Sequence, residues 1–144
     1  MLEDLGLAAA LQQESRLFQE RTGLRSRLDV AESLPALSRD AATAVFRICQ
    51  EALTNVARHA EATEVVVSLA EQAEQLVLQV ADNGRGIRAA DLEDPKSLGL
   101  LGMKERAASL GGELTFQPSS PRGTLVKLLL PSRKPTPPIH PAAV

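Results

Sequence analysis

Two adjacent segments with strand-like sequences, residues 64–70 and 75–82, restrict the folds open to this chain. Apolar residues recur at every second position of the first segment, and the second is a largely apolar run that ends at Asp82. The short polar stretch 71–74 between them is typical of a turn, so we expect two neighbouring strands. A carboxylate therefore stands at a strand end, directly before the glycine-containing segment 83–86.

The segment that begins at Asp82 reads Asp-Asn-Gly-Arg-Gly-Ile. Gly84 and Gly86 can take positive φ and allow a ligand to approach the backbone closely. An ionised carboxylate accepts hydrogen bonds but cannot donate them, so Asp82 suits a ligand amine, such as the exocyclic amine of adenine, and does not suit a phosphate. Asp-Asn-Gly is also a common turn sequence, so a tight loop without a ligand is an alternative for this segment taken alone.

The remaining sequence patterns predict three helices and about five strands in all. Helices are predicted at 8–21, from Ser38 or Asp40 to His59, and at 99–110, and the other strands at 24–30, 113–117 and 124–130. This order is not a regular βαβ alternation, and the chain has no Gly-x-x-x-x-Gly-Lys-Ser/Thr motif, which argues against doubly wound and P-loop folds. We predict a two-layer α/β sandwich, with the helices on one face of a mixed, mostly antiparallel sheet.

The predicted helix that ends at His59 carries two stripes. Its apolar stripe consists of Val45, Ile48, Cys49, Ala52, Leu53 and Val56. Glu51, Asn55 and His59 are each four residues apart and line an adjacent polar stripe. Carboxylate and amide oxygens suit Mg²⁺, which takes few protein ligands beside water and phosphate oxygens, while a solvated helix face is the alternative. Arg58 could pair with a phosphate or point to solvent.

A second glycine-containing segment, Gly99 to Met103, stands at the start of the last predicted helix. A helix N-terminus of this kind can bind phosphate through its free N–H groups. A loop whose glycines merely permit close packing is the alternative. Residues 88–97 are polar and lack periodicity, which predicts a mobile loop.

Composition excludes several classes of function. The net charge of −2 gives no long-range attraction to nucleic acid or anionic membranes, and three Phe with no Trp or Tyr argue against base stacking. No apolar run approaches the ~20 residues of a membrane span, and the N-terminus does not resemble a signal peptide. We therefore expect a cytoplasmic fragment that binds neither nucleic acid nor membrane, although upstream segments of a parent protein could anchor it in the inner membrane. The single Cys49 should be a buried, inert thiol.

Four motifs, in this order and spacing, resemble those of sensor histidine kinases. Residues 50–60 are similar to the asparagine box of that family, 82–86 to its first glycine box, 99–107 to its second, and Gly123-Thr124 to its closing Gly-Thr element. The form of these motifs is similar to the nitrate-sensor branch. The resemblance implies the Bergerat ATP-binding fold of the gyrase, chaperone, histidine kinase and mismatch-repair ATPases.

The resemblance also implies a division of the chain and a set of site residues. Residues 8–131 would be the ATP-binding catalytic domain, 1–7 a remnant of the linker from missing dimerisation helices, and 132–144 a disordered Pro-rich tail. Asn55 and Glu51 would be catalytic and would hold Mg²⁺, with Glu51 assisting proton removal. The residues expected to bind ATP are Asn55, Arg58, His59, Asp82, Gly84, Gly86, Ile87, Gly99, Leu100, Gly102, Met103 and Thr124. Asp82 would accept a hydrogen bond from adenine N6, and residues 88–98 would form a lid.

The family transfers the γ-phosphate of ATP to a histidine on a dimerisation domain, for relay to a response regulator. His59 lies inside the asparagine box and His140 in the Pro-rich tail, and these are the two histidines of the chain. We therefore expect an isolated catalytic domain that binds ATP, is monomeric and does not phosphorylate itself. The alternatives are an anti-sigma-factor-type serine kinase of the same fold and a non-catalytic nucleotide-sensing module.

Overall fold

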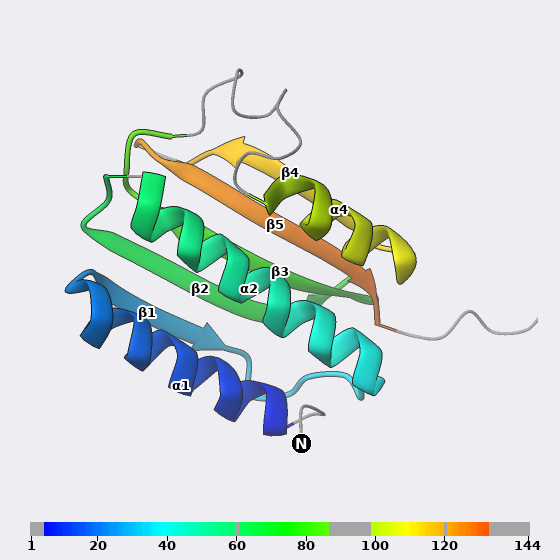
Figure 1. Ribbon diagram of the computed structural model, residues 1–144. Helices are drawn as coiled ribbons and strands as arrows, with labels where there is room; N and C mark the ends of the chain where they lie inside the picture. The colour runs from blue at the N-terminus through cyan, green and yellow to red at the C-terminus, as the bar shows by residue number, and fades with distance from the viewer. Residues whose placement is uncertain (1–4, 60, 87–98, 120, 133–144) are drawn as a thin grey trace, which may run out of the picture.

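Three helices cover one face of a five-stranded sheet in the part of the chain that the structure describes (Figure 1). The computed structural model describes residues 5–59, 61–86, 99–119 and 121–132. In chain order the elements are α1 (Leu5–Thr22), β1 (Arg25–Val30), α2 (Arg39–His59), β2 (Glu64–Gln72), β3 (Gln75–Asp82), α4 (Leu100–Ser109), β4 (Glu113–Pro118) and β5 (Thr124–Pro131). The predicted two-layer α/β sandwich is confirmed.

The sheet is mixed, with the strand order β1-β2-β3-β5-β4. β1 is parallel to β2 because the chain passes through α2 before it returns to the sheet, and the other three pairs are antiparallel. Along β1 exposed and half-buried residues alternate, as predicted for a half-exposed strand. The sheet is therefore mostly antiparallel, with its one parallel pair at the β1 edge.

The hairpin of β2 and β3 is longer than the sequence indicated. Its register runs from Val65 opposite Asp82 to Gln72 opposite Gln75, so the turn consists of Ala73 and Glu74 alone. The prediction of a four-residue turn at 71–74 was wrong in its length, because residues 71 and 72 belong to β2. Ala73 and Glu74 have φ values of 51° and 63°, the pattern of a type I′ turn, whose twist matches that of the strands. Alanine and glutamate are unusual in such a turn, so no sequence pattern indicated it.

The helix ends show how local sequence fixes the elements. α1 begins at Leu5, three residues earlier than predicted, and ends before Gly23, which has a φ of 76° and donates its N–H to Gln19 O at 2.8 Å. At the start of α2, Ser38 Oγ accepts a hydrogen bond from Ala41 N at 3.1 Å, so Ser38 is the predicted cap. Among the described residues no helix combines the length and hydropathy needed to cross a bilayer.

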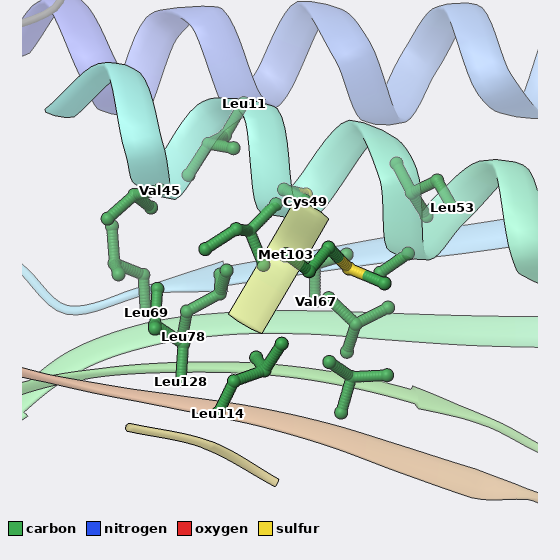
Figure 2. Close-up of a cluster of buried hydrophobic side chains, with 14 of the residues drawn as sticks. Leu11, Val45, Cys49, Leu53, Val67, Leu69, Leu78, Met103, Leu114 and Leu128 are labelled. Atoms are coloured by element: carbon green, nitrogen blue, oxygen red, sulfur yellow. The ribbon is translucent and has the colours of Figure 1, made fainter. Parts of the chain in front are cut away.

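The hydrophobic core lies between the helices and the sheet (Figure 2). All six residues of the predicted apolar stripe of α2 are buried. Cys49 is among them, with 2% of its surface exposed, and burial raises the pKa of its thiol to about 12. The predicted burial of Cys49 is confirmed, and its lack of reactivity stays a prediction. The labelled side chains of Figure 2 come from all three helices and from β2, β3, β4 and β5: Leu11, Val45, Cys49, Leu53, Val67, Leu69, Leu78, Met103, Leu114 and Leu128.

Candidate functional site

Asp82 is a buried carboxylate at the end of β3, with 6% of its surface exposed. Its Oδ1 atom accepts hydrogen bonds from Gly84 N at 2.8 Å and from Thr124 N at 3.4 Å. Within the described residues its Oδ2 atom accepts none. The backbone therefore fixes one oxygen of the carboxylate, whereas the other is not used as an acceptor by the described residues.

The electrostatics of Asp82 follow from the same geometry. Burial raises the pKa of the Asp82 carboxyl above its ordinary value, and the hydrogen bonds from the Gly84 and Thr124 N–H groups partly oppose this. A carboxylate removed from bulk water is a stronger hydrogen-bond acceptor for a ligand than a solvated one. The arrangement suits a ligand that donates a hydrogen bond to the carboxylate in place of the bulk water from which burial removes it.

The first glycine box lies against the Gly-Thr element. Gly86 has a φ of 84°, and a Cβ atom built on it would lie 3.3 Å from Gly123 O and 3.9 Å from Thr124 Oγ1. Gly123 has a φ of 110°, and a Cβ atom there would overlap the carbonyl oxygen of Asp82. Both positions need glycine because of their φ values and their close neighbours. The structure thus brings together Asp82, Gly84, Gly86 and Thr124.

The asparagine box lies against the second glycine box. Glu51 and Asn55 are half-buried on α2, and Arg58 is exposed on its last turn. Gly99, the N-cap of α4, has a φ of 67°, and a Cβ atom on it would overlap the carboxylate of Glu51. The carboxylate of Glu51 therefore rests on the backbone at the start of α4. His59 is the last residue of α2, and its side chain is not among the parts of the chain that the structure describes.

The predicted ligand residues of α4 have different surroundings. Leu100 and Met103 are 2% and 1% exposed and belong to the hydrophobic core, so their side chains are structural and only their backbone could contact a ligand. Gly102 is exposed, and nothing lies within 4 Å of the position of a Cβ atom on it. Ile87 and the predicted lid 88–98 lie outside the described residues.

Two side chains, Asn83 and Arg122, join the turn after Asp82 to other parts of the chain. Neither was predicted as a site residue. Asn83 Oδ1 accepts hydrogen bonds from Thr63 N at 2.9 Å and Glu64 N at 3.0 Å, and its Nδ2 donates to Thr63 Oγ1 at 2.8 Å. Arg122 Nε donates to Gly84 O at 2.7 Å. The position of Asn83 inside a predicted turn was a signal for the first role, whereas no sequence pattern indicated the second.

The end of α2 and the Asp82 turn lie at one end of the molecule. Figure 1 shows the C-terminal end of α2, the end of β3 and the start of β5 on the same side. The topology explains this, because α2 leads through the connection 60–63 into β2, and Val65 near the start of β2 is paired with Asp82. From the motifs we expect Asp82 and Asn55 to flank one cavity, and this expectation stays a prediction.

The side chains present fit Mg²⁺ better than a metal enclosed by protein ligands. Among the described residues no three or more His, Cys, Asp or Glu side chains are grouped to hold a metal ion. Glu51 and Asn55 offer oxygen atoms from one helix, and both are half-buried. Mg²⁺ usually keeps several waters and takes one or two protein oxygens together with substrate phosphates, so this donor set is sufficient for it.

The fold and these motifs define a nucleotide-binding ATPase domain. Residues 40–134 match the family described as histidine kinase-, DNA gyrase B-, and HSP90-like ATPases. Because the match covers more than half of the chain, the chain belongs to this family.

Its named relatives are sensor histidine kinases. The chain is 38% identical to the signal transduction histidine-protein kinase/phosphatase UhpB of Salmonella typhimurium, over 92% of the chain and 26% of UhpB. It is 37% identical to the sensor histidine kinase MctS of Rhizobium johnstonii, over 91% of the chain and 29% of MctS. It is 35% identical to the oxygen sensor histidine kinase NreB of Staphylococcus carnosus, over 90% of the chain and 38% of NreB. The chain thus spans well under half of each relative, and the recognition of a histidine kinase ATPase domain is confirmed.

Solved structures of the same fold agree. The histidine kinase domain of the blue-light-activated histidine kinase of Erythrobacter litoralis EL346 aligns with a TM-score of 0.74 and 23% identity, over 87% of this chain and 60% of that one. The histidine kinase AdeS of Acinetobacter baumannii aligns with a TM-score of 0.72 and 16% identity, over 88% of this chain and 65% of that one. At these identities the alignments support the fold, and the predicted Bergerat architecture is confirmed.

Proposed function

We propose that this chain is the ATP-binding catalytic domain of a sensor histidine kinase, which binds Mg-ATP for transfer of the γ-phosphate to a histidine of a dimerisation domain. The phosphoryl group would then pass to a response regulator. The observation that carries the proposal is Asp82, a buried carboxylate whose Oδ1 is held by backbone N–H groups and whose Oδ2 accepts no hydrogen bond within the described residues. Membership of the ATPase family and the names of the relatives support the class of reaction.

At the base-binding end, Asp82 would accept a hydrogen bond from the exocyclic amine of adenine. A hydrogen bond to a charged group contributes about 1.5–3 kcal/mol, which is enough to select an amine-bearing base. Gly84 and Gly86 would expose backbone to the base, because neither carries a side chain. Buried Thr124 would support this end through its N–H bond to Asp82.

At the phosphate-binding end, the proposal rests on α2 and the start of α4. Asn55 and Glu51 would hold Mg²⁺, and Arg58 and His59 would approach the phosphates. The backbone N–H groups of Gly99, Leu100, Gly102 and Met103 lie at the N-terminal end of α4, where the helix dipole favours an anion. When bound, ATP would supply the phosphoryl group, and Mg²⁺ would supply positive charge that neutralises the phosphates.

The chain itself contributes positioning rather than covalent chemistry, as phosphoryl transfer requires. The relatives compared above are histidine kinases by name, which favours a histidine acceptor over the serine acceptor of an anti-sigma-factor-type kinase. The acceptor histidine, the dimerisation domain and the response regulator would belong to other parts of the system. The chain alone should therefore bind nucleotide as a monomer and lack autophosphorylation.

Two measurements test the proposal. Calorimetric titration with a non-hydrolysable ATP analogue should show one site, with tighter binding in Mg²⁺ than in EDTA, and absence of binding in both would reject it. A transfer assay with ATP and a separately supplied dimerisation fragment of the parent protein should then yield an acid-labile phosphohistidine. An acid-stable phosphoserine would favour the serine kinase, and binding without transfer would favour a nucleotide-sensing module.

A further inference from the structure

The turn after Asp82 is attached to a distant part of the chain by one side chain. Asn83 makes three side-chain hydrogen bonds, all to Thr63 and Glu64, which are about twenty residues earlier in the sequence. Its backbone N–H also donates to Glu64 O at 3.3 Å. The amide orientation is defined by its partners, because two backbone N–H groups require an oxygen at Oδ1.

This attachment lies next to the atoms that orient the Asp82 carboxylate. Asn83 is the single residue between Asp82 and Gly84, and the N–H of Gly84 is the 2.8 Å donor to Asp82 Oδ1. That N–H belongs to the peptide group between Asn83 and Gly84, so its direction depends on the backbone conformation of Asn83. Arg122 Nε holds the other side of the turn through Gly84 O at 2.7 Å. The peptide groups on both sides of Gly84 are therefore held by hydrogen bonds, the first through its N–H and the second through its carbonyl oxygen.

The same side chain also touches the connection from α2. Thr63 belongs to the segment between His59, the last residue of α2, and Glu64, the first residue of β2. The bonds of Asn83 thus join the segment that follows the polar stripe of α2 to the turn that orients Asp82. Asn83 itself is exposed and does not belong to the hydrophobic core, so burial of its side chain does not account for its position.

We infer that Asn83 is a positioning residue for nucleotide selection: by fixing the turn to the connection before β2, it holds the Asp82 carboxylate in the orientation that accepts an amine. The inference rests on the proposed contact between Asp82 and adenine. It assigns to Asn83 no contact with the nucleotide. The loss of Asn83 should therefore weaken the discrimination between bases, and it should not weaken the binding of the triphosphate group that all the nucleotides share.

The test compares two nucleotides on the full 144-residue chain. ATP and purine riboside triphosphate differ by the exocyclic amine, so the ratio of their dissociation constants reports the Asp82 contact. In Asn83→Ala the affinity for ATP should fall about threefold to tenfold, the range set by the net free energy of one ordinary hydrogen bond. The affinity for purine riboside triphosphate should change by much less.

Two further variants separate positioning from general loss of structure. Asn83→Asp keeps an acceptor for the Thr63 and Glu64 N–H groups, and the Thr63 hydroxyl can donate to its second oxygen, so it should restore most of the discrimination. Gln75→Ala removes an exposed amide at the opposite end of β3 and should leave both affinities unchanged. Thermal denaturation of each variant confirms that the titrated protein is folded.

The outcomes distinguish this inference from the proposed function. If the wild-type chain binds both nucleotides equally, the proposed Asp82–adenine contact is wrong, and the role of Asn83 falls with it. If the wild-type chain discriminates but Asn83→Ala keeps the same ratio, or loses affinity for both nucleotides equally, the positioning role alone is overturned.

Discussion

Replacement of Asp82 by asparagine tests the site most directly, because it changes one atom, Oδ2, that accepts no hydrogen bond from the described residues. The hydrogen bonds from Gly84 N and Thr124 N go to Oδ1, which asparagine retains. The substitution replaces Oδ2, the acceptor left available, by an NH₂ group that would face the adenine amine donor to donor. Loss of a hydrogen bond to a charged group costs about 1.5–3 kcal/mol, so the affinity for ATP should fall about 10- to 150-fold.

The same variant should not lose stability without nucleotide. Burial raises the pKa of Asp82 in the folded chain, so between the unfolded and folded pKa values the folded state binds more protons. The free energy of unfolding of the wild type therefore falls as the pH rises through that window and remains lower above it. Asparagine does not ionise, so at neutral pH Asp82→Asn should be at least as stable as the wild type, and this relative gain should disappear below the ordinary pKa of aspartate.

Calorimetric titration with ATP and denaturant unfolding over a range of pH measure both effects. Asp29→Asn, at an exposed aspartate of β1, is the matched control and should change neither quantity. An unchanged affinity for ATP in Asp82→Asn would refute the adenine contact. A marked loss of stability at neutral pH would refute the assignment of Asp82 as a carboxylate kept for a ligand at a cost to the fold.

Four other substitutions and one chemical reaction have defined expected results. Asn55→Ala should abolish the difference between nucleotide titrations with and without Mg²⁺, and a difference equal to that of the wild type would place the metal elsewhere. Gly123→Ala should destabilise the chain strongly in denaturant unfolding, because its Cβ would meet backbone at a φ of 110°, whereas Gly102→Ala, in open space, should raise stability by about 0.5–1 kcal/mol. Leu78→Ala should lower the free energy of unfolding by about 2–5 kcal/mol, since the side chain is 1% exposed, and a loss below that range would show that the core repacks. Cys49 should resist a thiol reagent in the native chain and react on unfolding, and rapid native labelling would contradict its burial and raised pKa.

Elements whose pattern is local were predictable from the sequence. The apolar stripe of α2 identified a helix and its buried face, because residues three and four apart share one side of a helix. The alternation along β1 was likewise correct, and Ser38, one of the two predicted starts of α2, is its cap. The turn at Ala73 and Glu74 was missed because strand pairing placed two ordinary residues at positive φ, against their own preferences.

Contacts between distant segments were the part that the sequence did not specify. The motifs identified Glu51 and Gly99 separately, but only the packing of α4 beside α2 places the carboxylate on the glycine. The hydrogen bond from Arg122 to Gly84 joins the loop between β4 and β5 to the turn after β3. The local sequence around an exposed loop arginine does not predict such a partner. The positions of Leu100 and Met103 in the core were hidden for a related reason, since a motif does not say which side of a helix faces the sheet.

The contact between Glu51 and Gly99 has a mechanical consequence. At this point the carboxylate of Glu51 lies against the backbone of Gly99, the N-cap of α4. A shift of the Glu51 side chain would therefore change the charge beside the first turn of α4, where the helix dipole is positive. A larger residue at position 99 would have to adopt a φ of 67° and would force the carboxylate of Glu51 to move away from the start of α4.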